Sequence, residues 1–227
     1  MTGTLHLTAA DGHTLTAYEA APDQPRGGIV VLQEIFGVNH HIRSVCDRLA
    51  QRGYHAIAPS LFDRQAPGFE SGYSEQEIAQ ARSFLRAIDW DAMLLDLEAS
   101  AIRLKERVAG VAALGFCLGG SLAYLAATRG AVDAAVCYYG GQIAGFSDLA
   151  PKVPTLLHFG RTDHTIPLAD VAMIAKKQPQ LALHLYDAGH GFNCDERAGF
   201  EPQSAHAAWS RSLDFLEAVI PAKADGC

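Results

Sequence analysis

A cysteine lies between two glycines in the segment G-F-C-L-G at positions 115–119. An apolar run at 111–114 precedes it and a run of helix-forming residues at 121–127 follows it. This order predicts a strand, a sharp turn and a helix, with glycines where side chains would clash. The positive end of that helix would stabilise a thiolate and the oxyanion formed when it attacks a carbonyl. Cys117 is therefore a candidate nucleophile, although these five residues alone fit a buried cysteine in a tight turn equally well.

An acid and a base follow later in the chain, each beyond a different predicted strand. Asp163 comes just after the apolar run 155–159, and His190 comes just after 182–186. Histidine can take the thiol proton and pass it to a leaving group, while aspartate orients the imidazole and stabilises its charge. Alone, Asp163 fits a turn residue and His190 a solvated loop histidine. Together with Cys117, their order favours a catalytic triad.

These residues need a scaffold that brings strand ends together. After an antiparallel hairpin at about 4–20, the pattern alternates between strand and helix, which predicts the α/β class with a mostly parallel, doubly wound sheet and helices on both faces. Ligand sites in such sheets lie at the carboxyl ends of the strands. The predicted strands are 29–32, 54–58, 111–115, 134–139, 155–159 and 182–186. The predicted helices are 41–52, 75–108 with a break near Asp89-Trp90, 119–129, 168–177 and 204–219.

The loop after strand 29–32 carries further candidates. The amides of Ile35 and Leu118, the residue after the cysteine, would form an oxyanion hole. Glu34 would lie near Cys117, and a carboxylate at the end of an apolar strand is costly unless it has a partner. It either acts on the cysteine or pairs with a nearby arginine.

Composition excludes several classes of protein. Hydrophobic residues make up 49% of the 227 residues, charged residues 19%, and the net charge is −7. These values predict one globular domain over 1–227, with a loose C-terminus at about 221–227. The chain has no basic run for nucleic acid, no apolar stretch that would span a membrane, and no signal-like start. We therefore expect a cytoplasmic protein, monomer or weak homodimer, that acts on a small molecule.

Metals and cofactors are not expected either. The five cysteines are widely spaced without a C-x-x-C pair, which argues against a zinc site or a disulfide framework. Cys46 and Cys137 are predicted to be small core or boundary residues, and Cys227 a loose terminal one. The pair His40-His41 opens a helix without the motif of a metal site, and no glycine-rich phosphate loop occurs.

Four segments together resemble the dienelactone hydrolase (carboxymethylenebutenolidase) family. They are Q-E-I-F-G-V-N at 33–39, R-Q-A-P-G at 64–68, G-F-C-L-G-G at 115–120 and G-H-G-F at 189–192. The likeness extends from about residue 13 to 219. It implies a single α/β-hydrolase domain without a large lid, whose nucleophile elbow would be 115–119. It also implies hydrolysis of the lactone ring of dienelactones to maleylacetate, in the breakdown of chlorinated aromatic compounds.

The resemblance also implies roles for individual residues. Cys117, His190 and Asp163 would form the triad, and Glu34 would take the thiol proton when substrate arrives. Two arginines hold the substrate carboxylate in the family, but their positions are occupied here by Ile78 and Cys194. Arg82 and Arg197 are offered as replacements from shifted positions; otherwise they lie on a solvated helix face and in a loop salt bridge. Tyr139, at a strand end, is a further candidate for the pocket wall, or else a core or rim residue.

The sequence therefore predicts a hydrolase of a small ester or lactone, of the dienelactone type, that works through a thioester acyl-enzyme. One alternative is a carboxylesterase or thioesterase with a neutral substrate, which the displaced arginines favour. Another is a noncatalytic ligand-binding or redox-sensing protein on the same fold, because a thiolate at a helix N-terminus oxidises easily. The presence of Asp163 and His190 argues against it, since sensing needs neither.

Overall fold

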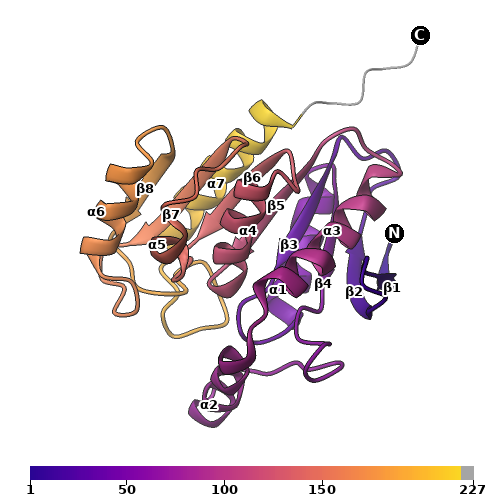
Figure 1. Cartoon of the computed structure of the whole chain (residues 1–227), viewed down its shortest axis with the longest axis horizontal. Helices are drawn as coiled ribbons and strands as arrows, with labels where there is room; N and C mark the ends of the chain where they lie inside the picture. Colours follow the sequence, from indigo (N-terminus) through magenta and orange to yellow (C-terminus); the bar gives the residue numbers. More distant parts are fainter. Residues whose placement is uncertain (221–227) are drawn as a thin grey trace.

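A single eight-stranded sheet organises the computed structural model, which describes residues 1–220 (Figure 1). The strand order is β1-β2-β4-β3-β5-β6-β7-β8, parallel from β4 to β8 and antiparallel at the β1–β2 edge. The strands are β1 (Thr2–Thr8), β2 (Thr14–Ala20), β3 (Gly27–Leu32), β4 (Tyr54–Pro59), β5 (Val111–Phe116), β6 (Ala134–Tyr138), β7 (Thr155–Gly160) and β8 (Ala182–Tyr186). The predicted class, N-terminal hairpin and mostly parallel sheet are confirmed. The predicted loose C-terminus, with Cys227, lies outside the described residues.

Helices cover both faces of this sheet. They are α1 (His40–Gln51), α2 (Glu75–Ser83), the 3-10 helix η1 (Phe84–Ala87), α3 (Trp90–Lys105), α4 (Leu118–Arg129), α5 (Ile143–Phe146), α6 (Leu168–Lys177) and α7 (Pro202–Val219). Helices α3 to α6 follow one another along one face, and α1 and α7 cover the other (Figure 1). Within residues 1–220, no helix is both long and apolar enough to span a lipid bilayer.

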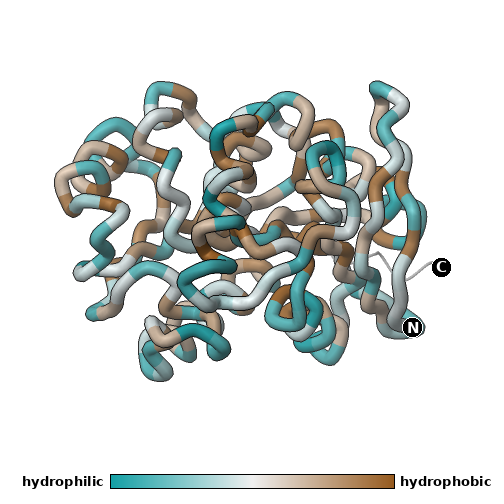
Figure 2. Tube along the Cα trace, turned by 90° about the horizontal axis from the view of Figure 1, so that it is seen from below, coloured by the Kyte–Doolittle hydropathy of each residue, from teal (hydrophilic) through white to brown (hydrophobic). Residues whose placement is uncertain are grey.

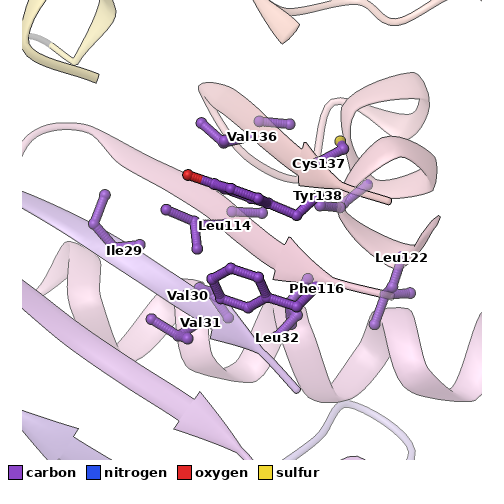
Figure 3. Packing of buried hydrophobic residues seen from close by; sticks show 14 of the residues in the cluster. Ile29, Val30, Val31, Leu32, Leu114, Phe116, Leu122, Val136, Cys137 and Tyr138 are labelled. Atoms are coloured by element: carbon purple, nitrogen blue, oxygen red, sulfur yellow. The ribbon is translucent and has the colours of Figure 1, made fainter. Parts of the chain in front are cut away.

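The central strands are buried on both faces, which explains why they read as unbroken apolar runs. Every residue of β3, β4, β5, β6 and β7 is buried. Their side chains pack between the two helix layers, where Phe116 meets Tyr138 with ring centroids 4.8 Å apart (Figure 3). Hydrophobic positions concentrate in these strands and hydrophilic ones in the outer loops (Figure 2). Cys46 and Cys137 are fully buried in this core, as predicted.

The helical region 75–108 is interrupted near the expected place. Helix α2 starts with the predicted capping box, in which Ser74 and Glu77 satisfy each other's backbone amides. After η1, α3 begins anew with Asp89 as its N-cap. Ala81 is the one buried residue of α2, and this helix projects beyond the strand ends (Figure 1). The short α5, which follows the bend at Gly140-Gly141, was not predicted.

Candidate active site

Cys117 occupies a strained turn between β5 and α4. Its backbone angles are φ 52° and ψ −111°, a region that residues with side chains rarely adopt. A Cβ on Gly115 would lie 2.0 Å from the carbonyl oxygen of Gly119, and one on Gly119 would lie 2.3 Å from that of Leu32. Both glycines are therefore required because backbone approaches backbone, as the sequence predicted.

The two predicted oxyanion-hole residues lie beside this turn. The amide of Gly119 donates to the carbonyl of Gln33 at 3.0 Å, which ties the start of α4 to the end of β3. That contact brings Ile35 and Leu118 to the same cavity as Cys117. Amides at the first turn of a helix have no intrahelical acceptor, so the amide of Leu118 suits an incoming oxyanion.

His190 and Asp163 are in direct contact. The Nδ1 atom of His190 lies 2.7 Å from Oδ2 of Asp163. Because an ionised carboxylate only accepts hydrogen bonds, Nδ1 carries the proton and Nε2 is left for the nucleophile. The other oxygen of Asp163 accepts from the backbone amides of Thr165 and Ile166, at 2.8 and 3.2 Å. The structure thus brings these two predicted residues together in the orientation that base catalysis requires.

Thr165 is a member of this cluster that sequence reasoning missed. Its hydroxyl donates to Oδ1 of Asp163 at 2.6 Å and lies 2.9 Å from Nδ1 of His190. With its own proton given to the carboxylate, the hydroxyl accepts from His190. A threonine two residues after an aspartate in a turn was the available signal, since such side chains commonly close local hydrogen bonds.

The charges in the cluster favour an imidazolium. Burial alone would lower the pKa of His190, but the negative charge of a Cys117 thiolate and the hydrogen bond to Asp163 raise it to about 10. Burial alone would raise the pKa of Asp163, but His190 and Thr165 hold it below its ordinary value of 3.8. An imidazolium at His190 would therefore be stabilised by the Asp163 carboxylate on one side and by a negative charge on Cys117 on the other.

Glu34 is nearly fully buried and pairs with Arg197. Its Oε1 atom lies 3.0 Å from Nη1 of Arg197, whose side chain is 19% exposed. The guanidinium also lies over the ring of Phe36, 5.3 Å from its centroid. Of the two alternatives for Glu34, pairing with an arginine is the contact that the structure shows.

A cavity of about 450 Å³ opens onto Cys117 and His190. Arg82 from α2 and Arg197 from the loop before α7 both line it, so the two displaced arginines reach one site. The apolar part of its lining comes from α2, η1 and the start of α3: Ile78, Leu85, Ile88 and Trp90. At 450 Å³ the cavity is of the size that accommodates a small organic molecule.

Tyr139 does not line this cavity. Its side chain is fully buried, and its ring packs against His190 with centroids 5.0 Å apart and against Phe192 at 5.3 Å. Its backbone has a positive φ of 38°, because the chain turns sharply at the end of β6. The ring lies against that of His190, so Tyr139 is the core residue of the two alternatives, and the expectation that it lines the pocket wall is corrected. Cys194, which takes the place of a family arginine, is buried 3.3 Å from the hydroxyl of Tyr73.

Known proteins resemble this chain over nearly its whole length. The model of the dienelactone hydrolase family matches residues 15–220. A carboxymethylenebutenolidase from Pseudomonas putida and one from Pseudomonas knackmussii are each 38% identical over 228 residues, covering 95% of this chain and 96% of their own. A solved structure titled "Putative Dienelactone Hydrolase", from Klebsiella pneumoniae, has a TM-score of 0.82 at 28% identity and covers 96% of this chain and 99% of its own. These matches include every element that carries a candidate site residue.

Proposed function

The chain belongs to the dienelactone hydrolase family and is an ester or lactone hydrolase, and from this premise we propose that it opens dienelactone-type rings through a Cys117–His190–Asp163 triad. The observation that carries the proposal is that Arg82 and Arg197 line the same cavity as Cys117 and His190. A small substrate that carries both a carboxylate and an activated ester would meet its anion partners and its nucleophile in one place.

In the proposed reaction the Cys117 thiolate attacks the lactone carbonyl carbon. The carbonyl oxygen becomes an oxyanion, which the amides of Ile35 and Leu118 stabilise. Collapse of this intermediate breaks the ring C–O bond, and His190 gives its Nε2 proton to the leaving oxygen. Water, deprotonated by the now neutral His190, then attacks the thioester. Its hydrolysis releases the acid and restores the thiolate and the imidazolium.

The ion pair of Glu34 offers a way to couple substrate arrival to activation. A substrate carboxylate would compete with Glu34 for Arg197, because both are anions within reach of one guanidinium. A Glu34 carboxylate deprived of its partner in a buried site gains by taking a proton. Where Cys117 carries its proton as a thiol, it can supply that proton, which then passes on to His190 and leaves the thiolate and imidazolium from which the reaction starts. We assign this role to Glu34, and the binding of the substrate carboxylate to Arg82 and Arg197.

The alternative with a neutral substrate has its own support in the apolar wall at Leu85, Ile88 and Trp90. A neutral ester would use the same nucleophile and oxyanion hole and would ignore the arginines. The two possibilities therefore differ in their dependence on Arg82, which lies on α2 far from the triad in sequence.

Steady-state hydrolysis of cis- and trans-dienelactone, beside a neutral p-nitrophenyl ester, tests both possibilities. We expect turnover of dienelactone by the wild type and its loss in Cys117→Ala. The variant Arg82→Met should raise KM for dienelactone and leave the neutral ester unaffected. Mass spectrometry of the quenched reaction should find the acyl group on Cys117. Cleavage of the neutral ester alone would refute the dienelactone assignment, and full activity of Cys117→Ala would refute the triad.

A further inference from the structure

Four consecutive residues of the loop before α7 each meet a partner on a facing segment. Cys194 contacts Tyr73, Asp195 contacts His41, Glu196 contacts His40 and Arg197 contacts Glu34. Three of these partners lie within 34–41, the segment that leads from β3 into the first turn of α1 and carries Ile35. Successive residues of the loop thus contact the segment next to Cys117, and Arg197 makes the last of these contacts.

Of the two contacts before Arg197 that involve a carboxylate, that of Asp195 with His41 is the better buried. His41 is fully buried, and its Nδ1 atom lies 3.0 Å from Oδ1 of Asp195. Because the carboxylate can only accept, His41 donates from Nδ1. Its Nε2 atom is buried and has no hydrogen-bond partner within residues 1–220. Asp195 is therefore the one polar partner of this ring, which makes the contact costly to lose.

His41 also connects the loop to the nucleophile strand. Its ring lies against Phe116, the residue before Cys117, with centroids 5.9 Å apart. By contrast, the His40 side chain is 81% exposed where it meets Glu196, and ion pairs so exposed contribute little. Within residues 1–220, no cluster of histidine, cysteine and acidic side chains could hold a metal ion, so the two histidines serve another purpose.

Arg197 needs such an attachment because its own side chain is long and flexible. Its guanidinium packs closely over Gly191, where an added Cβ would lie 2.4 Å from Nη1. It also stacks on Phe36 while it bonds Glu34. A shift of the backbone two residues earlier, at Asp195, would displace the guanidinium from this narrow position at the cavity wall.

We propose that Asp195, held by His41, is a positioning residue that keeps Arg197 at the cavity and so gives the Cys117 site its preference for anionic reactants. This inference rests on the proposed function only in taking Arg197 as the receptor of a substrate anion. It adds a second pair of residues, outside the triad and the oxyanion hole, to the determinants of specificity.

Alkylation of Cys117 tests the inference without requiring turnover. Iodoacetate and iodoacetamide have nearly the same shape, and the thiolate displaces iodide from each to form a thioether. Only iodoacetate carries a charge, so the ratio of the two rates, divided by the same ratio for free cysteine, measures the preference for an anion. Peptide mass spectrometry assigns the modification to Cys117. The test variants are Asp195→Ala and Asp195→Asn. The matched control is Asp187→Ala, which removes another exposed aspartate from the connection between β8 and α7, one that pairs with Arg161.

We expect the wild type to prefer iodoacetate and Asp195→Ala to lose about three- to tenfold of that preference, the value of one hydrogen bond that positions a charged group. The iodoacetamide rate should change less than about twofold. Asp195→Asn should restore most of the preference, since its amide oxygen still accepts from His41. Asp187→Ala should behave as wild type.

Three results would overturn the inference: no preference in the wild type, an unchanged preference in Asp195→Ala, or an equal loss of both rates in that variant. A wild type that alkylates with the expected preference but fails to hydrolyse dienelactone would count against the proposed function alone. Melting temperatures of all variants show whether each is folded.

Discussion

Replacing Arg197 by methionine should destabilise the protein by about 2–3 kcal/mol. Removing one partner of a buried ion pair typically costs about 3–5 kcal/mol, because the other charge stays buried and unpaired. Glu34 is such a charge, with 2% of its side chain exposed, while Arg197 is 19% exposed at the cavity wall. Water from the cavity can reach the space that Arg197 leaves, so we place the cost just below that range.

Urea denaturation followed by circular dichroism measures this change, and for a chain of this size it corresponds to a fall of about 5–10 °C in melting temperature. Methionine keeps much of the apolar stem of arginine, which confines the loss to the charge and its hydrogen bond. The double variant Glu34→Gln with Arg197→Met should recover at least about 1 kcal/mol, because a neutral amide costs less to bury than a carboxylate. If Arg197→Met unfolds within about 0.5 kcal/mol of wild type, Glu34 is hydrated or protonated and the reasoning fails.

Three further outcomes follow from the site. Gly119→Ala should lose at least about 3 kcal/mol of stability, because its Cβ would lie 2.3 Å from a backbone carbonyl of β3, whereas Gly145→Ala, with open space around it, should melt like wild type. Thr165→Val should lower kcat about three- to tenfold and alter the pH–rate profile, and Thr165→Ser should retain both, since the hydroxyl alone contacts the base. The folded-state pKa of His190, about 10, exceeds its ordinary 6.5, so its stabilisation is complete below 6.5 and is lost as pH rises through 10. The pKa of Asp163 is lowered, so its stabilisation is present above 3.8 and is lost as pH falls through the lowered value. The difference in melting temperature between wild type and His190→Asn should therefore be largest between pH 3.8 and 6.5 and should decrease toward both extremes.

The elements that position Cys117, Asp163 and His190 could be predicted because local signals and tertiary structure agree. Strand β5 is an apolar run buried on both faces, and it is followed by glycines that permit backbone contact at the turn. The order of Cys117, Asp163 and His190 then follows from the order of the strands, since parallel strands present their carboxyl ends on one side. The place of each of these three residues at a strand end depends on the backbone alone, so it can be predicted from a single sequence.

The residues that contact charge at the cavity could not be predicted in the same way. The position of Arg197 depends on where a long side chain ends, and the loop that carries it has no regular repeat. Tyr139 was expected at the wall because it follows a strand, but a positive φ turns its ring beneath His190. Thr165 was missed because its role arises from a bifurcated contact that exists only once Asp163 and His190 meet.

The burial of Glu34 explains why an arginine is needed at the cavity. This arginine lies at a different distance along the chain from His190 than the family resemblance led us to expect. A carboxylate that is 2% exposed at the end of β3 must be paired, whichever loop supplies the cation. Arg197, seven residues after His190, supplies this cation. The loop that carries it contacts α1 through Asp195 and His41. In this site the arginine at the cavity is found by asking which residue neutralises the buried Glu34 carboxylate, a question that a count of residues from His190 does not answer.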